Sequence, residues 1–278
     1  MNITDAYPPQ HHMLRDLLIS MEFKGKRRCT VQAPVVPEIC TDRGGVHVGV
    51  VATLVDILGG GLAIRAIYPD WIATADLSIY TTERAALGTI TASGTVIRAG
   101  QTTLVIEVDI LQEAGDCASP ISSIGWAMMT FSRLPRRKDT IVLNERSTEA
   151  IAFGVQESGL SRPYLDEVGV RILEEAAGVA EINMSDYVRN SFRALQGGIV
   201  ALLADVAGQQ AARAAMKRPV ISRDLTIHYL SQGKVGPFRT RAKVVRKASG
   251  SALTRVEVID TGASNRLIAV AMNAATLD

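Results

Sequence analysis

The sequence predicts an α+β protein of two tandem domains, in each of which a curved antiparallel sheet wraps around one long central helix. Three observations predict this architecture. Two long segments, residues 48–66 and 197–216, are apolar on nearly every face, as buried helices are. Strand-like segments with alternating apolar residues follow each of them. The second half of the chain also repeats the first. Because a helix that is apolar all round needs cover on every side, we expect the two domains to pack as an intramolecular pseudo-dimer.

The repeat extends over four blocks that occur in the same order in both halves. Residues 47–56 (HVGVVATLVD) align with residues 196–205 (QGGIVALLAD), and both blocks end in an aspartate. Three strand segments follow at offsets of 148 to 150 residues: 76–80 with 224–228, 96–98 with 244–246, and 106–108 with 256–258. Such order and spacing indicate a duplication, and a chain of 278 residues has room for two domains.

In the first half, a short helix is predicted over residues 12–20 and two strands over residues 21–23 and 28–33. A loop rich in proline, glycine and polar residues, 34–45, leads into the first apolar helix. Four further strands complete this domain, over residues 74–82, 87–99, 102–113 and 121–133.

The first apolar helix carries one acid near its middle, Asp56, and three consecutive glycines, Gly59, Gly60 and Gly61. A lone carboxylate in an apolar helix is costly to ionise, so its pKa should tend upward. Each glycine costs about 1 kcal/mol of helix propensity relative to alanine. We therefore expect this part of the helix to lie very close to the sheet.

The second half repeats the plan after a polar linker. We place the first domain at residues 1–138, the linker and lead-in at 139–164, and the second domain at 165–278. Within the second domain, residues 185–195 form the loop before the helix. Its strands are predicted over residues 168–174, 179–184, 221–230, 238–247, 252–260 and 267–275.

Composition excludes several classes of function. The net charge is only +2 with dispersed basic residues, so no nucleic-acid partner is expected. The three cysteines show no disulfide or metal-binding spacing, so we expect no metal and a reducing compartment. No signal peptide is evident, and the longest apolar run is interrupted by Asp56 and the glycines. A cytoplasmic protein without a membrane partner is the expectation.

The two helix blocks, each followed about twenty residues later by a D-L-[ST]-I strand, resemble hotdog-fold acyl-CoA thioesterases of the PaaI-like class, which includes a 4-hydroxybenzoyl-CoA thioesterase branch. The resemblance covers about residues 20 to 133 and 165 to 276. It implies a tandem, or double, hotdog in which two units pack side by side with their sheets joined. It also implies an acyl-CoA substrate and no cofactor other than the CoA of that substrate.

The family's site combines an amide side chain, a backbone N–H at the helix start, the helix acid, and a Ser or Thr before the D-L strand pair. The resemblance places these parts of the second unit at Asn190, Gly197, Asp205 and Ser222. In the first unit it places them at Asp56 and Thr74, with His47 as the family histidine. The first unit departs from the pattern, because Val48 replaces the glycine, and Thr41, beside Asp42, replaces the amide.

Helix geometry predicts that these parts combine across the two units. Gly197 and Asp205 are eight residues apart, so about 12 Å of helix separates them, too far for one thioester carbon to contact both. If the helices pack antiparallel, each helix start lies beside the acid of the other. One composite site would then contain Asn190, Gly197, Asp56 and Thr74, and the other Val48, Asp205 and Ser222.

We expect the first composite site to be the working one, because all of its residue types are present. Two alternatives stay open: both sites work, or the parts of the second unit serve only structure. Asp56 would act as general base for water or as a nucleophile. His47 serves catalysis or only orients the loop at the helix start, and His228 is expected to be structural.

Two other functions remain as alternatives to hydrolysis: an enoyl-CoA hydratase or dehydratase, and a non-catalytic acyl-CoA-binding protein. The hydratase pattern D-x4-N-x2-H is not found in this sequence. The low aromatic content of 5% favours aliphatic acyl groups. We also expect a homodimer of tandem chains. Candidate cations for the CoA phosphates are Arg98, Arg133, Lys243 and Arg246.

Overall fold

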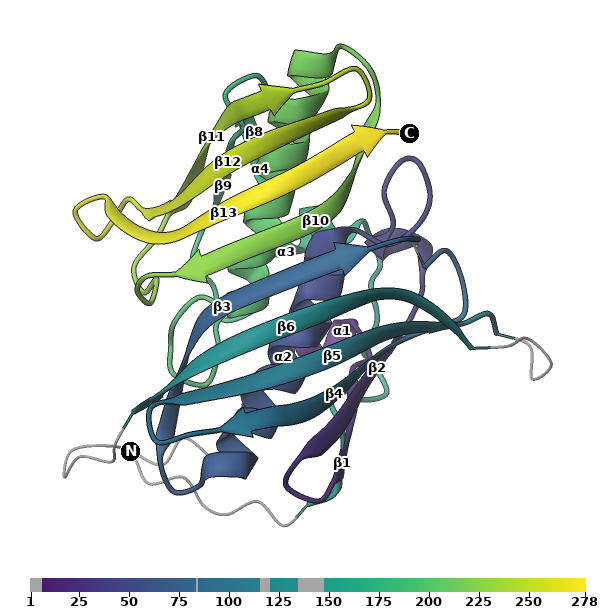
Figure 1. The fold of residues 1–278 in the computed structure, drawn as a ribbon, viewed down its shortest axis with the longest axis vertical. Helices are drawn as coiled ribbons and strands as arrows, with labels where there is room; N and C mark the ends of the chain where they lie inside the picture. The colour runs from purple at the N-terminus through teal and green to yellow at the C-terminus, as the bar shows by residue number, and fades with distance from the viewer. Residues whose placement is uncertain (1–6, 84, 116–120, 135–147) are drawn as a thin grey trace.

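The computed structural model describes residues 7–83, 85–115, 121–134 and 148–278. These residues form one 13-stranded antiparallel sheet with two long helices behind it (Figure 1). The strand order is β7-β1-β2-β4-β5-β6-β3-β10-β13-β12-β11-β9-β8. The order within the second half repeats that within the first. The tandem hotdog architecture is thus confirmed.

The first half contains the strands that the alternating pattern predicts, each within three residues of its predicted ends. Buried and exposed residues alternate along them, as the pleat of a strand requires. The elements are α1 (Met13–Asp16), β1 (Ser20–Lys24), β2 (Arg28–Pro34), the short 3-10 helix η1 (Pro37–Ile39), α2 (Val48–Ile67), β3 (Trp71–Thr81), β4 (Thr89–Ala99), β5 (Thr103–Glu113) and β6 (Ser122–Leu134).

The second half follows the same plan, again with one short helix before its first strand. Its elements are α3 (Tyr164–Val168), β8 (Arg171–Glu174), β9 (Val179–Ile182), α4 (Gly197–Met216), β10 (Val220–Tyr229), β11 (Phe238–Lys247), β12 (Ser251–Asp260) and β13 (Arg266–Leu277).

The strand predicted over residues 168–174 is wrong at its start, because α3 ends at Val168. Pro163 immediately precedes α3, and Gly169 ends it in the left-handed conformation at φ 81°. Proline at the start and glycine at the end of a short segment are the ordinary boundaries of a helix. The alternating pattern before residue 171 was therefore misleading.

The predicted linker also contains structure. Strand β7 (Ala150–Ala152) pairs antiparallel with β1 and so extends the first sheet. The predicted boundary at residues 138 and 139 lies outside the described residues. From residue 148 onward, the chain therefore completes the edge of the first sheet before it enters the second domain.

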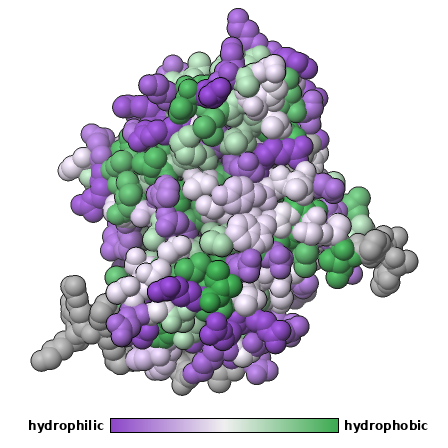
Figure 2. Space-filling model, in the orientation of Figure 1, coloured by the Kyte–Doolittle hydropathy of each residue, from purple (hydrophilic) through white to green (hydrophobic). Residues whose placement is uncertain are grey.

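The two sheets join where β3 pairs antiparallel with β10. The register runs from Asp76 opposite His228 to Tyr80 opposite Asp224. His228 contacts the Asp76 carboxylate through its Nδ1 across this junction. Figure 2 shows the sheet face turned away from the helices, where pale and green atoms cover much of the centre.

The long helices are apolar all round because each is covered by its own sheet and by the other helix. By length and composition α2 alone would be able to cross a membrane, but 67% of its most apolar window is buried inside the protein. Gly59 lies against β6, where an added Cβ would be 2.2 Å from the Met129 sulfur. A Cβ added to Gly60 would have no atom from outside its own helix within 4 Å. The predicted close contact with the sheet therefore holds for Gly59 but not for Gly60.

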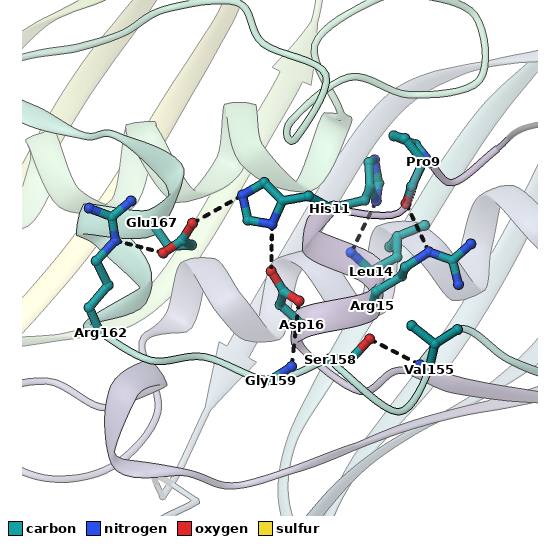
Figure 3. Close-up of polar contacts among 11 residues, drawn as sticks. Pro9, His11, Leu14, Arg15, Asp16, Val155, Ser158, Gly159, Arg162 and Glu167 are labelled. Atoms are coloured by element: carbon teal, nitrogen blue, oxygen red, sulfur yellow. Dashed lines mark hydrogen bonds and ion pairs between the residues drawn. The ribbon is translucent and has the colours of Figure 1, made fainter.

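The segments that precede the first strand of each domain contact each other through α1 and α3 (Figure 3). The ring of His11 lies between two carboxylates, with Nδ1 3.5 Å from Asp16 and Nε2 3.3 Å from Glu167. The Arg15 guanidinium donates to the carbonyls of Pro8, Pro9 and Phe153 at 2.8 Å each. These bonds fix the backbone of the N-terminal segment directly after Tyr7.

Candidate active site

The two long helices pack antiparallel and in very close contact. A Cβ added to Gly49 would lie 2.5 Å from the Leu202 Cα, and one added to Gly198 would lie 2.5 Å from the Thr53 Cα. Because the contacts run in opposite directions along the two helices, the start of each helix lies beside the middle of the other. The structure thus brings each helix start to the acid of the other domain.

At the start of α4, one carboxylate oxygen of Asp56 is hydrogen-bonded within the described structure and the other is not. Oδ2 accepts hydrogen bonds from the Gly198 N–H at 3.0 Å and from the Gln196 Nε2 at 3.1 Å. Oδ1 accepts none from the residues that the structure describes. A Cβ added to Gly197 would lie 2.8 Å from this oxygen, so only glycine allows this approach. The Asp56 Oδ1 therefore lies directly beside the first residue of α4.

The backbone N–H of Gly197 finds no hydrogen-bond acceptor within the described chain. The first N–H groups of a helix lack intrahelical partners and carry the positive end of the helix dipole. A free donor and a free carboxylate oxygen thus meet at the start of α4. This pair can polarise a carbonyl and attack it, or activate water for the attack.

Burial raises the pKa of Asp56 to about 6, and the hydrogen bond from the Gly198 N–H partly opposes this effect. Two phenols lie near this carboxylate, Tyr7 and Tyr229. Burial raises the pKa of both, and the negative charge of Asp56 raises it further. Both phenols are therefore protonated at neutral pH, while Asp56 titrates just below it.

The other two predicted parts of this site are less directly engaged. The Oδ1 of Asn190 accepts from the backbone N–H of Phe192 at 2.9 Å and of Ala194 at 3.0 Å, which shapes the loop before α4. Its amide NH2 is then the group left to meet a substrate. Thr74 lies at a β-bulge of β3, opposite Phe131, and makes no hydrogen bond to Asp56 in the described structure. The structure therefore brings Asp56 and Gly197 together, and among the described residues neither Asn190 nor Thr74 is hydrogen-bonded to them.

At the start of α2, both oxygens of Asp205 are occupied. Oδ2 accepts from the Gly49 N–H and Oδ1 from the Asn273 Nδ2, each at 3.0 Å. The same Asn273 amide donates to the Ser222 hydroxyl at 3.0 Å. Burial raises the pKa of Asp205, and the hydrogen bond from Ser222 opposes this effect. Asp205 is thus a fully bonded internal carboxylate, only 2% exposed.

His47 and Val48 complete this second group. Burial lowers the pKa of His47, and the negative charge of Asp205 partly opposes the shift, so the ring is neutral at ordinary pH. A cavity of about 10 Å³ remains here, lined by Thr41, Val46, His47, Val48, Asp205, Gln209, Ile221 and Ser222. Such a volume holds one water molecule at most. A thioester does not fit without movement of the walls.

Two substitutions account for the difference between the two groups. Val48 stands where Gly197 leaves room for a carboxylate oxygen. Asn273 stands where the first domain has Met129, since each lies against an equivalent helix glycine, Gly208 and Gly59 respectively. Asn273 supplies a donor that occupies the Asp205 carboxylate, whereas Met129 has no donor to offer Asp56. The two composite sites therefore differ in the freedom of the acid.

The structure does not gather the four proposed CoA-binding cations. Arg133 donates to Asp70 at 2.5 Å and to the Gly100 carbonyl at 3.2 Å. Arg98 is exposed and lies near the same turn, with its Nε 3.5 Å from an added Gly100 Cβ. Lys243 and Arg246 are exposed on β11, seven strand positions away from β4. The four cations therefore form two separate pairs, Arg98 with Arg133 in the first domain and Lys243 with Arg246 in the second.

Sequence reasoning missed four residues of the two groups: Gln196, Tyr229, Asn273 and Tyr7. Gln196 was detectable, because it aligns with His47 in the repeat. Tyr229, whose hydroxyl donates to the Gly197 carbonyl at 3.0 Å, follows the repeated strand at a position where the first domain has Thr81. Asn273 and Tyr7 carry no local pattern, since only the tertiary fold brings them to the helices.

Comparisons with known proteins agree with this architecture. The family model of the thioesterase superfamily matches residues 43–119 and 194–264, together just over half of the chain. A Halobacterium salinarum protein provisionally named as an esterase is 30% identical over 119 residues, which span 40% of this chain and 78% of that protein.

Three solved structures show the same tandem fold at low sequence identity. The tesB protein of Mycobacterium avium subsp. paratuberculosis has a TM-score of 0.63 and 12% identity, over 93% of this chain and 96% of that one. An acyl-ACP thioesterase from Bacteroides thetaiotaomicron has a TM-score of 0.58 and 12% identity, over 89% and 97%. The acyl-CoA thioesterase II of Mycobacterium marinum has a TM-score of 0.55 and 15% identity, over 90% and 93%. With the family match covering both halves, this chain belongs to the thioesterase superfamily and is a thioester hydrolase of two tandem hotdog domains.

Proposed function

We propose that this protein hydrolyses acyl-CoA thioesters to a free acid and CoA at a composite site formed by Asp56 of the first domain and the start of α4 in the second. One observation carries the proposal. Among the described residues, the Asp56 Oδ1 accepts no hydrogen bond and the Gly197 N–H beside it has no acceptor. No equivalent pair exists at Asp205, where both oxygens accept hydrogen bonds.

In the proposed reaction the thioester carbonyl oxygen accepts a hydrogen bond from the Gly197 N–H. The helix start stabilises the negative charge that develops on this oxygen. Asp56 either takes a proton from the attacking water or attacks the carbonyl carbon itself to form an anhydride that water then hydrolyses. In both routes the carbon–sulfur bond breaks, the thiolate leaves as CoA and takes up a proton, and the acyl group gains the oxygen of water.

The roles of the other two predicted residues follow from the polar groups that they can offer to the substrate. The Asn190 amide NH2 would add a hydrogen bond to the substrate carbonyl, because its oxygen is already used by the loop. Thr74 would orient the attacking water. This chemistry requires no metal or further cofactor. Both halves of the site lie in one chain, so the proposed activity does not depend on the homodimer that the sequence predicts.

The aromatic pair of Phe192 and Trp71 bears on which acyl groups the site could accept. Their rings lie 4.7 Å apart at a tilt of 57°, and Phe192 belongs to the loop that Asn190 shapes. Offset aromatic pairs at this distance form a firm apolar contact. An aromatic pair on the loop before α4 is compatible with aryl as well as aliphatic acyl groups. The preference for aliphatic substrates drawn from composition therefore stays a prediction.

The substrate class is tested by free-thiol release from a panel of thioesters. The panel contains acyl-CoA esters of increasing length, benzoyl-CoA, and the same acyl groups on acyl carrier protein, since structural neighbours are named for both carriers. We expect the highest kcat/KM on acyl-CoA. Turnover only on the carrier protein would overturn the CoA assignment, and absence of turnover on the whole panel would overturn the proposed activity.

A further inference from the structure

Tyr229 is connected to Asp56 through a single peptide group. Its hydroxyl donates to the carbonyl oxygen of Gly197 at 3.0 Å. The N–H of the same peptide, which belongs to Gly198, donates to the Asp56 Oδ2 at 3.0 Å. The phenol, the peptide and the carboxylate therefore form one continuous chain of hydrogen bonds.

We propose that Tyr229 is a positioning residue of the proposed active site, whose hydroxyl polarises the peptide between Gly197 and Gly198 and so strengthens the hydrogen bond that holds Asp56. The inference rests on the proposed function of Asp56 but names a residue outside that proposal. A peptide whose carbonyl accepts an additional hydrogen bond is a better donor at its N–H, because bonds in a chain polarise one another. The effect is larger where water is excluded, and Asp56 is 7% exposed.

The connection is specific to this site. In the repeat, the position of Tyr229 corresponds to Thr81 of the first domain. The Thr81 hydroxyl donates to the Arg223 carbonyl at 2.7 Å and does not contact the start of α2. The group around Asp205 therefore lacks the equivalent link. Its acid is held by the side chain of Asn273 instead.

The phenol is suited to this role because it stays a donor. Burial raises the pKa of Tyr229, and the Asp56 charge raises it further, so the hydroxyl keeps its proton over the pH range in which Asp56 titrates. The other groups that face Asp56 are Gln196, which donates to the same oxygen, and Tyr7, whose pKa the Asp56 charge raises and which makes no hydrogen bond to Asp56 in the described structure. Neither of them bonds to the peptide between Gly197 and Gly198.

The test is a direct titration of Asp56 followed by the 13C resonance of its carboxyl group, which is assigned by its loss in Asp56→Asn. In Tyr229→Phe the ring and its packing remain, and only the donor is lost. We expect the pKa of Asp56 to rise by roughly 0.3 to 1 unit and the Gly198 amide proton to move upfield, because its hydrogen bond weakens. Thr81→Val, which removes the equivalent hydroxyl of the first domain, is the matched control and should leave both signals unchanged.

This measurement does not depend on turnover, so it separates the two proposals. An unchanged pKa of Asp56 in a folded Tyr229→Phe protein would overturn the link, whatever the activity. If Tyr229→Phe does not fold, 3-fluorotyrosine in a Tyr7→Phe background serves instead, since a more acidic phenol donates more strongly. The pKa of Asp56 should then fall, and a rise or no change would count against the proposal. In an active protein, Tyr229→Phe should lower kcat/KM about two- to fivefold at pH 6 and much less at pH 9.

Discussion

The Oδ2 of Asp56 lies 3.0 Å from the backbone nitrogen of Gly198, which is 142 residues away in the sequence and in the other domain. The mirror relationship, Gly49 with Asp205, also has a distance of 3.0 Å. Each domain therefore supplies the acid for the helix start of the other. The difference between the two groups lies in the second carboxylate oxygen, which accepts a hydrogen bond from Asn273 in Asp205 but from none of the described residues in Asp56.

Activity should rise with pH through the ionisation of Asp56. Both proposed roles need the carboxylate form, and the pKa of Asp56 is raised to about 6 by burial. The profile of log kcat/KM against pH should therefore climb with a slope of one and level off above an apparent pKa of about 6. A profile that is level from pH 5 to pH 8 would contradict the assignment of Asp56 as base or nucleophile.

Gly197→Ala should remove activity through one added carbon. Its Cβ would lie 2.8 Å from the Asp56 Oδ1, so the oxygen and the helix start must move apart. We expect kcat/KM to fall by about 10²-fold, as for loss of an oxyanion donor. Gly60→Ala, which adds the same methyl group to the other long helix, α2, where it meets open space, is the matched control. It should keep full activity and gain up to about 1 kcal/mol in the free energy of unfolding.

Asp56→Asn should make the protein more stable at high pH. A buried acid whose folded pKa is about 6, above the 3.8 of an aspartate in water, favours folding most when it is protonated. That contribution is present below about pH 4 and is lost as the pH rises through 6. The amide variant should therefore gain about 1–3 kcal/mol in the free energy of unfolding at pH 8 and little at pH 4. Urea denaturation at the two pH values measures the difference, and an equal effect at both would argue against a raised pKa.

Asp205→Ala should lower the stability of the protein but leave its activity nearly unchanged. It leaves the buried Gly49 N–H without an acceptor and the Asn273 amide with the Ser222 hydroxyl alone, which costs about 2–4 kcal/mol. The folded protein should retain its kcat/KM within about twofold, because the free carboxylate is on the other helix. Asp205→Asn should cost less, since the Oδ1 of Asn273 has no partner in the described structure and is available to accept from the new amide.

The repeat explains why so much of the fold was predictable. Two apolar helices and alternating strands at a constant offset specify the tandem sheet, and α4 lies at its predicted bounds, Gly197–Met216. The misleading part was local. The segment from Tyr164 to Val168 is bounded by proline and glycine and forms a helix, while β7 adds to an edge strand that is distant in sequence.

The site was predictable only where its residues belong to the repeat. Asp56 and Gly197 are found from the aligned helix blocks, and helix length alone predicts that they combine across the domains. Asn273 and Tyr229 lie on strands that carry no recognisable motif at these positions. Their roles become visible only in the folded structure, where they contact the Asp205 carboxylate and the Gly197 carbonyl, respectively. Periodicity shows which face a residue occupies but not which carboxylate it reaches.

The most direct test of the account is the loss of thiol release in Asp56→Asn compared with Asp205→Asn, on the best acyl-CoA of the panel. Both variants remove one negative charge from equivalent positions of the repeat and keep the shape of the side chain. We predict that Asp56→Asn loses about 10³-fold in kcat/KM, as for removal of a base or nucleophile, while Asp205→Asn stays within about threefold. Equal losses in the two variants, or the larger loss in Asp205→Asn, would contradict a single working site at Asp56.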